Sequence, residues 1–356
     1  LKVLNIILRI LALIFCRRTG SGNPQRILVL RIDERMGNLI LTTPLLAEAR
    51  RVWPDAQLDV LVSARYAGLL TENKYSIGVI PFEKRALFRR PLSWLKLMLK
   101  LRSTVYDLTI DASHEHAFSL TSVLLTVWCG SPLRVGHERK HSECVYTHVA
   151  KQSAEGIPEA LRKLKLLETL DVISIGEYRP WLGSNNIEAE KWADEWLKIN
   201  NPAGRKILAV FTGARKADRR LSAIDFLFIS KVLKNSAAWI PLFVGGLNDA
   251  EQIASLRSLF SECGALFPPE LDIYKLRAIL ALSDAVVCAD TGPLHLAWAL
   301  GRPLLSLHRA GSAARWGHSD KISRALVFTS GSEKSQAEAM QALTCILQEI
   351  ERHENS

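Results

Sequence analysis

An acidic and an amide side chain follow the first apolar segment of the chain, in a position to handle the proton of a reacting group. Residues 26–31 read RILVLR, a short branched run typical of a buried parallel strand. Asp33, Gly37 and Asn38 come directly after it. A carboxylate on such a loop can act as a general base, and a glycine before a helix lets the backbone approach an anion. The alternative is that Asp33 or Asn38 caps the next helix, expected from about residue 39 to 53.

A second polar loop follows the apolar strand expected at residues 206–211 and carries several basic side chains. It contains Thr212, Gly213, Arg215 and Arg219. A loop that binds phosphate needs backbone N–H groups and long cations, and this loop can supply both. It is not a P-loop, because no Gly-Lys-Ser/Thr follows at Walker spacing. A solvated basic loop is the alternative interpretation.

The third polar segment, DTGPLH, also follows a short apolar strand. Pro293 is suited to the first turn of a helix, which would leave Thr291 and Gly292 to offer a hydroxyl and free N–H groups to a pyrophosphate. Asp290 can cap, hold the loop or contact a ligand. His295 lies early in the expected helix, where a structural role is as consistent with its position as a catalytic one.

Two further groups of polar residues are weaker signals. The Gly-Gly pair at 245–246 is followed by Asp249 and Glu251, acids that can bind ribose hydroxyls. A basic amphipathic stretch at residues 88–102, together with the cations just before it, can contact a phosphate-rich acceptor, with a solvated helix face as the alternative. The candidate contacts include Lys84, Arg85 and Arg89.

Strands and helices alternate along both halves of the chain, which predicts an α/β protein with two parallel sheets and crossover helices. The expected strands of the first half are 26–31, 57–63, 77–81 and 107–111. Those of the second half are 206–211, 239–244, 285–289 and 303–307. Segment 178–186 is rich in Pro, Gly and Asn and is expected to link the halves. Ligands of such sheets bind where strands end, so the expected site is a cleft between the two halves.

The composition excludes several classes of protein. Of 356 residues, 48% are hydrophobic and 23% charged, which excludes a wholly disordered chain. No run of 18 uncharged apolar residues predicts a membrane-spanning helix. The 46 basic and 36 acidic residues give a net charge of +10, which indicates an anionic partner. Basic and aromatic residues are not interleaved as in nucleic-acid-binding proteins, so we expect no nucleic acid partner. The six cysteines are scattered, which favours a reducing, cytoplasmic setting.

The N-terminal segment 1–20 predicts a strongly apolar helix with a thin basic stripe. Lys2, Asn5 and Arg9 share one face, and leucine and isoleucine residues cover the rest. Such a helix is suited to a membrane interface, with the basic pair at 17–18 meeting anionic headgroups. A helix docked on the protein's own core is the alternative.

The polar loops and their flanking strands resemble glycosyltransferase family 9, the ADP-heptose:lipopolysaccharide heptosyltransferases. The resemblance extends from residue 26 to about 317. Its segments read RILVLRIDERMGNLILTTPLLAEARRVWPDAQLDVLV, VFTGARKADRRLSAIDF, ADTGPLHLAWALGRPLLSLH and, further on, ARWG. The DTGPLHLA block with the downstream ARWG is the most specific part.

This resemblance implies a GT-B fold, in which two Rossmann-like domains face each other across a cleft. The implied divisions are an amphipathic helix at 1–20, an acceptor domain at 21–178, a nucleotide-sugar domain at 187–331 and a C-terminal helix at 332–356. The implied activity is an inverting transfer of heptose, or a related sugar, to a lipopolysaccharide core-type acceptor. No metal or cofactor is expected besides the nucleotide-sugar co-substrate, expected to be ADP-heptose. The implied location is cytoplasmic, peripheral on the inner face of the cytoplasmic membrane.

The family pattern also suggests roles for individual residues. It implies donor binding by Thr212, Gly213, Arg215, Arg219, Asp249, Glu251, Asp290, Thr291, Gly292, Pro293 and His295. Acceptor binding is expected of Arg31, Gly37, Lys84, Arg85 and Arg89.

The sequence departs from the family at the residue after Gly37, where the usual catalytic aspartate is replaced by Asn38. An amide cannot act as a general base at neutral pH. We therefore expect Asp33 to take that role, with Asn38 beside it in the catalytic centre. A non-catalytic relative that binds nucleotide-sugar or glycan is the alternative.

Overall fold

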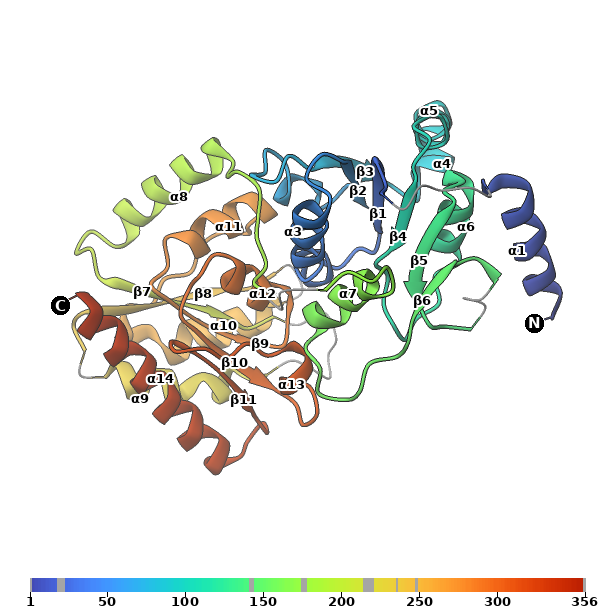
Figure 1. Cartoon of the computed structure of the whole chain (residues 1–356). Helices are drawn as coiled ribbons and strands as arrows, with labels where there is room; N and C mark the ends of the chain where they lie inside the picture. The colour runs from blue at the N-terminus through green and yellow to red at the C-terminus, as the bar shows by residue number, and fades with distance from the viewer. Residues whose placement is uncertain are drawn as a thin grey trace. The chain divides into compact units, whose positions relative to one another are not determined.

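The computed structural model describes residues 2–17, 23–140, 144–173, 178–213, 221–234, 236–246 and 249–354. The chain divides into two compact units, Leu1–Ser184 and Asn185–Ser356, each with its own parallel sheet (Figure 1). The division falls within the segment 178–186 that is rich in Pro, Gly and Asn. Arg215 and Arg219 of the predicted donor loop lie outside the described residues.

Six parallel strands form the sheet of the first unit, in the order β3-β2-β1-β4-β5-β6. They are β1 Arg26–Arg31, β2 Gln57–Ser63, β3 Gly78–Phe82, β4 Leu108–Asp111, β5 Leu133–His137 and β6 His148–Ala150. The central strands are buried on both faces, which explains why they read as continuous apolar runs. The strand order changes direction between β1 and β4, so the carboxyl ends of these two strands form the switch point at which ligands of such sheets bind.

The helices of the first unit cover both faces of this sheet (Figure 1). They are α1 Lys2–Phe15, α2 Met36–Ile40, α3 Thr43–Val52, α4 Ala86–Arg89, α5 Pro91–Ser103, α6 Leu120–Cys129 and α7 Glu159–Glu168, with a 3-10 turn η1 at Ala67–Leu69. The helix expected near 39–53 is two helices, and the basic stretch up to residue 102 is likewise divided. Pro44 and Pro91 lie at the start of the second helix in each case, because proline has no N–H to continue a preceding helix.

Helix α1 is docked on its own unit by one face. Leu8 is fully buried in an apolar cluster with Val123 and Val127 of α6. The backbone N–H of Arg17 donates to the carbonyl oxygen of Gly130 at 3.1 Å, directly beyond α6. The docked alternative is therefore correct for this face, while the opposite face of α1 remains exposed. Among the residues described, no helix has the length and apolar character needed to cross a membrane.

Five parallel strands form the sheet of the second unit, in the order β11-β10-β9-β7-β8. They are β7 Lys206–Phe211, β8 Trp239–Val244, β9 Ala285–Ala289, β10 Leu304–His308 and β11 Ser323–Val327. The order changes direction between β7 and β9, whose carboxyl ends carry Thr212 and Asp290. These two predicted donor residues thus lie at the switch point of this sheet.

The helices of the second unit include the C-terminal segment that was expected to stand alone. They are α8 Ile187–Asn200, α9 Leu227–Leu233, α10 Ala250–Leu259, α11 Ile273–Ala281, α12 Gly292–Ala299, α13 Ala313–Trp316 and α14 Glu333–Glu354, with 3-10 turns η4 Ala223–Phe226 and η6 Ser261–Cys263. In α14, Ala339 and Leu343 are fully buried in the same cluster as Phe228 of α9. Because α14 completes this core, it belongs to the second unit.

Candidate active site

The carboxylate of Asp33 is held at the carboxyl end of β1 by two neighbours. Its Oδ2 accepts a hydrogen bond from Asn38 Nδ2 at 2.6 Å and lies 3.4 Å from Nη2 of Arg31. Arg31 is 1% exposed and also donates to the carbonyl oxygen of Ala112, directly after β4. The residue before α2, Arg35, has no side-chain cap, so neither Asp33 nor Asn38 caps this helix. The capping interpretation is wrong, and the three polar side chains form one linked group.

Within this group the acid and the amide have different chemical capacities. Asn38 is buried and donates its amide hydrogen to Asp33, so the amide serves as an orienting donor. The Asp33 side chain is 36% exposed, and it is the only member of the pair that can accept a proton. Gly37 is buried inside α2, next to Asn38 in sequence. The arrangement therefore suits a general base that is oriented by an amide and a guanidinium.

A buried polar network lies beside this group, at the end of β4, and no sequence pattern predicted it. Asp111 accepts hydrogen bonds from the Tyr146 hydroxyl and from the backbone N–H of Ser113, the latter at 2.9 Å. Arg139 lies 3.3 Å from the same carboxylate. Burial and the charge of Asp111 hold the pKa of Tyr146 well above its ordinary value, so this phenol remains a donor. The partners are far apart in sequence, which is why only the fold reveals them.

Lys163 of α7 extends the network into the interior. Its Nζ lies 3.1 Å from Oε1 of Glu159 and donates to the carbonyl oxygen of Ser113 at 3.0 Å. The side chain is fully buried, and burial lowers its pKa to about 8 although Glu159 opposes the shift. Arg162, on the same helix, pairs at 3.0 Å with buried Glu115 of the loop after β4. The Arg162–Glu115 ion pair and the Lys163 hydrogen bond to Ser113 fix this loop against α7.

The predicted acceptor cations are not brought together in one cluster. Arg31 is buried at the end of β1, whereas Lys84, Arg85 and Arg89 are exposed in the segment that follows the edge strand β3. Strand β2 separates β3 from β1, so the two groups follow strands that are not neighbours in the sheet. Arg31 orients Asp33, and the three exposed cations form a separate basic surface.

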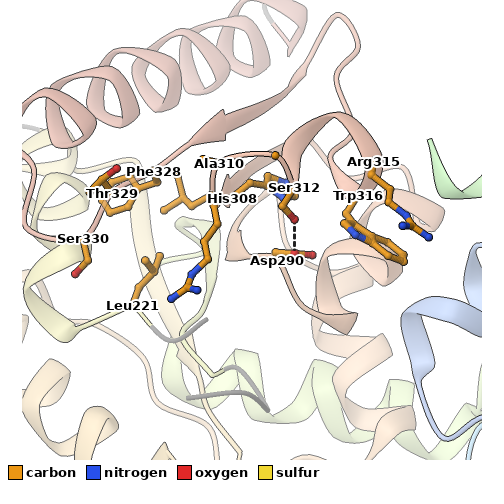
Figure 2. A pocket seen from close by; sticks show the side chains of 13 residues that line it. Leu221, Asp290, His308, Ala310, Ser312, Arg315, Trp316, Phe328, Thr329 and Ser330 are labelled. Atoms are coloured by element: carbon orange, nitrogen blue, oxygen red, sulfur yellow. Dashed lines mark hydrogen bonds between the residues drawn. The ribbon is translucent and has the colours of Figure 1, made fainter. Parts of the chain in front are cut away.

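The second unit contains a polar pocket of about 630 Å³ at the carboxyl ends of β9, β10 and β11 (Figure 2). Its volume is within the range that small-molecule ligands occupy. Asp290 lines this pocket after β9 and accepts a hydrogen bond from Ser312 Oγ at 2.6 Å (Figure 2). Arg315 also lines it, with its guanidinium 4.9 Å from the centre of the Trp316 ring. Cations, hydroxyls and an aromatic ring are the groups that a nucleotide requires.

The loops after β7 and β8 are tied together by Asp249. This residue is 7% exposed, and its Oδ2 accepts a hydrogen bond from the backbone N–H of Gly246 at 2.8 Å. A Cβ at Gly213 would lie 2.0 Å from the same oxygen, so only glycine fits there. Thr212 is fully buried, and its hydroxyl has no hydrogen-bond partner among the described residues. Glu251 is exposed in the first turn of α10, so of the two predicted ribose ligands Asp249 is the one engaged within the protein.

Helix α12 begins at Gly292, with Thr291 before it and proline in its first turn, as the sequence predicts. His295 is 4% exposed, and its Nδ1 lies 2.9 Å from Nε2 of His318. The His318 ring stacks on Trp298 with centroids 3.5 Å apart, and burial lowers the pKa of His318 to about 2. His295 is therefore packed in a buried aromatic cluster with His318 and does not line the pocket.

Sequence reasoning missed most of the pocket lining. The end of β10 and the loop after it contribute His308, Arg309 and Ser312, and the segment after β11 contributes Thr329 and Ser330. A usable signal existed for the first group, because ligands bind beyond the carboxyl ends of parallel strands and a strand was expected at 303–307. Strand β11 was not predicted, so the residues after it could not be found in the same way.

Comparison with known proteins agrees with this geometry. The model of glycosyltransferase family 9 (heptosyltransferase) matches residues 94–348. The lipopolysaccharide heptosyltransferase 3 of Escherichia coli is 20% identical over 294 residues, 79% of this chain and 82% of the relative. The lipopolysaccharide heptosyltransferase 1 of E. coli O18:K1:H7 (strain RS218 / NMEC) is 24% identical over 334 residues, covering 88% of this chain and 94% of that relative.

A solved structure, the E. coli ADP-heptose lps heptosyltransferase II, matches 93% of this chain and all (100%) of its own with a TM-score of 0.73 and 19% sequence identity. That likeness shows the fold, GT-B with two Rossmann-like units. The family match covers far more than half of the chain. The chain therefore belongs to glycosyltransferase family 9, the heptosyltransferase family, and is a glycosyltransferase.

Proposed function

We propose that this protein transfers heptose, or a related sugar, from ADP-heptose to a lipopolysaccharide core-type acceptor, with inversion and without a metal ion. The observation that carries the proposal is the Asp33 carboxylate, oriented by Asn38 and Arg31 at the switch point of the first sheet. The names of the relatives, which include ADP-heptose and lipopolysaccharide, support the choice of donor and acceptor.

In the proposed reaction Asp33 accepts the proton of an acceptor hydroxyl while the hydroxyl oxygen bonds to the anomeric carbon. The bond between that carbon and the diphosphate oxygen breaks, and the electron pair leaves with the nucleoside diphosphate. Attack from the side opposite the leaving group inverts the anomeric centre. Arg309 and Arg315 of the pocket can neutralise the departing diphosphate, and the predicted Arg215 and Arg219 would add to them.

The proposed location is the inner face of the cytoplasmic membrane. A nucleotide-sugar is made in the cytoplasm, and a lipopolysaccharide acceptor is anchored in lipid, so the two substrates meet at that surface. The enzyme is then a peripheral cytoplasmic protein whose first unit receives the acceptor and whose second unit receives the donor.

One observation favours a second candidate, a non-catalytic relative that binds nucleotide-sugar or glycan. Asn38 stands where the family pattern has its aspartate, and it is hydrogen-bonded as an amide. In this candidate the Asp33–Asn38 pair holds a bound sugar hydroxyl and takes no proton from it.

Turnover by the purified protein separates the two candidates. With ADP-, GDP- and UDP-sugars and a deacylated lipopolysaccharide core as acceptor, we expect transfer from the ADP-sugar. Asp33→Asn should lower kcat by about 100-fold or more and change donor affinity less than about twofold, because only proton transfer is lost. Asp55→Asn, at an exposed aspartate of the same unit, is the matched control and should keep full activity. Nucleotide binding without transfer to any acceptor would favour the non-catalytic candidate.

A further inference from the structure

Four helices of the first unit contain no acidic residue and leave large apolar side chains exposed. They are α1, α4, α5 and α6. The acid-free stretches extend beyond the helices, over residues 2–32, 84–106 and 116–137. The chain has 36 acidic residues, and these adjoining helices contain none of them. The surface that the helices present therefore has no acidic side chain of their own. We call this surface the helical face.

Helix α5 has apolar residues on two opposite sides. The inner side packs into the core through Met98 and Leu101, which are 4% and 0% exposed. The outer side carries Leu92, Leu95 and Leu99, which are 75%, 49% and 56% exposed. The outer residues recur at spacings of three and four, so they form one stripe along the helix. Packing within the chain accounts for the inner stripe and leaves the outer one unexplained.

Helix α1 repeats this arrangement. Its inner side is buried through Leu8, while its outer side carries six exposed aliphatic residues. They are Val3, Ile6, Ile7, Ile10, Leu13 and Ile14, between 46% and 68% exposed. Helix α6 lies between α1 and α5 in the contacts of the unit, and its Leu120 and Leu124 are 45% and 41% exposed. Helices α1, α6 and α5 are neighbours (Figure 1). Each contributes exposed apolar residues to the helical face.

The C-terminal ends of these helices are fastened to one another. Arg102 of α5 donates through Nη1 to the carbonyl oxygens of Phe15, at 2.8 Å, and Trp128, at 3.1 Å. The rings of Phe15 and Trp128 lie 5.7 Å apart. The indole of Trp128 donates to the carbonyl oxygen of Met98 at 2.8 Å. The three helices are therefore fixed as one layer, so the face can act as a unit.

We propose that the helical face docks the protein on an anionic lipid bilayer, with the outer stripes in the headgroup boundary. The charged residues on the face are all basic. Exposed examples are Arg9, Arg89, Arg90, Lys96 and Lys100. A second copy of the chain would bring like charges together, whereas anionic headgroups complement them. Exposed apolar side chains with flanking lysine and arginine are the pattern of interfacial membrane helices.

This inference deepens the membrane location contained in the proposed function by naming the surface and its ligand. It adds α5 and α6 to the N-terminal helix that the sequence indicated. It also explains why a helix can dock on its own unit and still present an apolar side outward.

Flotation with lipid vesicles tests the proposal on the full chain. We expect binding to vesicles of phosphatidylglycerol and phosphatidylethanolamine, and much weaker binding to phosphatidylcholine. Leu92→Gln, Leu95→Gln and Leu99→Gln together should lower the partition coefficient at least tenfold, and so should Ile6→Gln, Ile10→Gln and Leu13→Gln. All six side chains are exposed, so the fold should survive. The matched control is Ile187→Gln, Ile199→Gln and Ile224→Gln, three exposed isoleucines of the second unit, which should leave binding unchanged.

The basic component is tested separately. Lys96→Gln with Lys100→Gln should lower binding to anionic vesicles roughly tenfold or more, because each cation near such a surface contributes about a fivefold factor. Lys198→Gln with Lys231→Gln, two exposed lysines of the second unit, should have little effect.

Several results would overturn the proposal. The proposal fails if the wild-type protein does not float with anionic vesicles. It also fails if the stripe variants float as well as the wild type. A dimer in sedimentation that the same glutamine substitutions dissociate would assign the face to a second copy. Sugar transfer to a deacylated, water-soluble acceptor does not require a membrane, so it tests the proposed function separately from membrane docking. The stripe variants should retain that activity, and flotation without any transfer would refute only the proposed function.

Discussion

A single hydrogen bond of 2.6 Å, from Asn38 Nδ2 to Asp33 Oδ2, orients the carboxylate of the candidate base. The amide lies on α2, and the acid lies on the loop before it. The pair still contains one carboxylate and one donor. Arg31, buried behind Asp33, places its guanidinium 3.4 Å from the Asp33 carboxylate and helps to orient it.

Exchanging the two side chains tests whether the chemistry belongs to the pair. The double variant Asp33→Asn with Asn38→Asp keeps one carboxylate, one amide and their hydrogen bond. We expect the kcat of the double variant to be at least about tenfold higher than that of Asp33→Asn alone, because a base is again present beside the acceptor. The rate is measured by coupled release of nucleoside diphosphate. A double variant as inactive as Asp33→Asn would mean that only the loop position reaches the substrate.

The buried imidazole of His318 makes stability depend on pH. In the folded protein its pKa is lowered to about 2 by burial first and then by His295 and His308, against 6.5 when it is unperturbed. Between these values the unfolded chain binds the extra proton, so the free energy of unfolding falls as the pH drops. We expect a contribution of about 1.4 kcal/mol per pH unit below pH 6.5.

Urea unfolding between pH 4.5 and 7 measures this slope. His318→Phe keeps an aromatic ring on Trp298 and should reduce the slope by about the same 1.4 kcal/mol per unit. The exposed His353 of α14 provides the control, since His353→Gln should leave the slope unchanged. Parallel curves for His318→Phe and wild type would contradict the burial argument.

At the scale of elements, the second unit depends on contacts between loops that follow different strands. The loops after β7 and β8 meet where Gly213 approaches the Asp249 carboxylate, and the loops after β9 and β10 meet through the hydrogen bond between Ser312 and Asp290. Each contact joins residues that are distant in sequence. The pocket therefore depends on the sheet order that brings the strand ends together.

Gly213 shows how little space one of these contacts leaves. Gly213→Ala would place a methyl group 2.0 Å from Asp249 Oδ2, so the loops after β7 and β8 must separate. We expect the free energy of unfolding to fall by about 1–3 kcal/mol, the range for overpacked sites. Gly246→Ala is the matched control, since its Cβ would lie at an ordinary 3.5 Å from Asp249. Thermal or urea unfolding of both variants checks the expectation, and equal stabilities would refute it.

For the whole molecule, two units with separate cores imply separate responses to ligand. The first core is built around Ile27, Val60 and Ile110, and the second around Val210, Val287 and Leu305. The pocket of about 630 Å³ lies entirely in the second unit. A nucleotide should therefore protect one unit from local opening more than the other.

Hydrogen exchange with and without ADP measures this difference. We expect increased protection in the segments that line the pocket, 307–316 and 328–330, and at 290–293. The strand ends of the first unit near residues 31–38 should change little, because ADP carries no acceptor. Uniform protection of both units, or protection confined to the first, would contradict the assignment of the donor to the second unit.

The sequence by itself determined the alternation of strands and helices, the two-unit division near 178–186 and the family. Apolar runs such as 26–31 and 206–211 are typical of buried strands, and prolines and glycines mark the ends of elements. These are local properties, and local propensities are readable in order along the chain. The sequence could predict the positions of Asp33, Asn38 and Asp290 for the same reason, because each one follows a strand closely along the chain.

Only the tertiary structure decided which side chains meet. It joined Asp33 to Asn38 and Arg31, enclosed His295 with His318, and assembled pocket residues from three strand ends. It also showed that α1 is docked by one face and exposed by the other, where the sequence had left two alternatives. The reason is physical: hydrogen bonds and burial depend on distances set by strand order and helix packing, and spacing along the chain does not contain those distances.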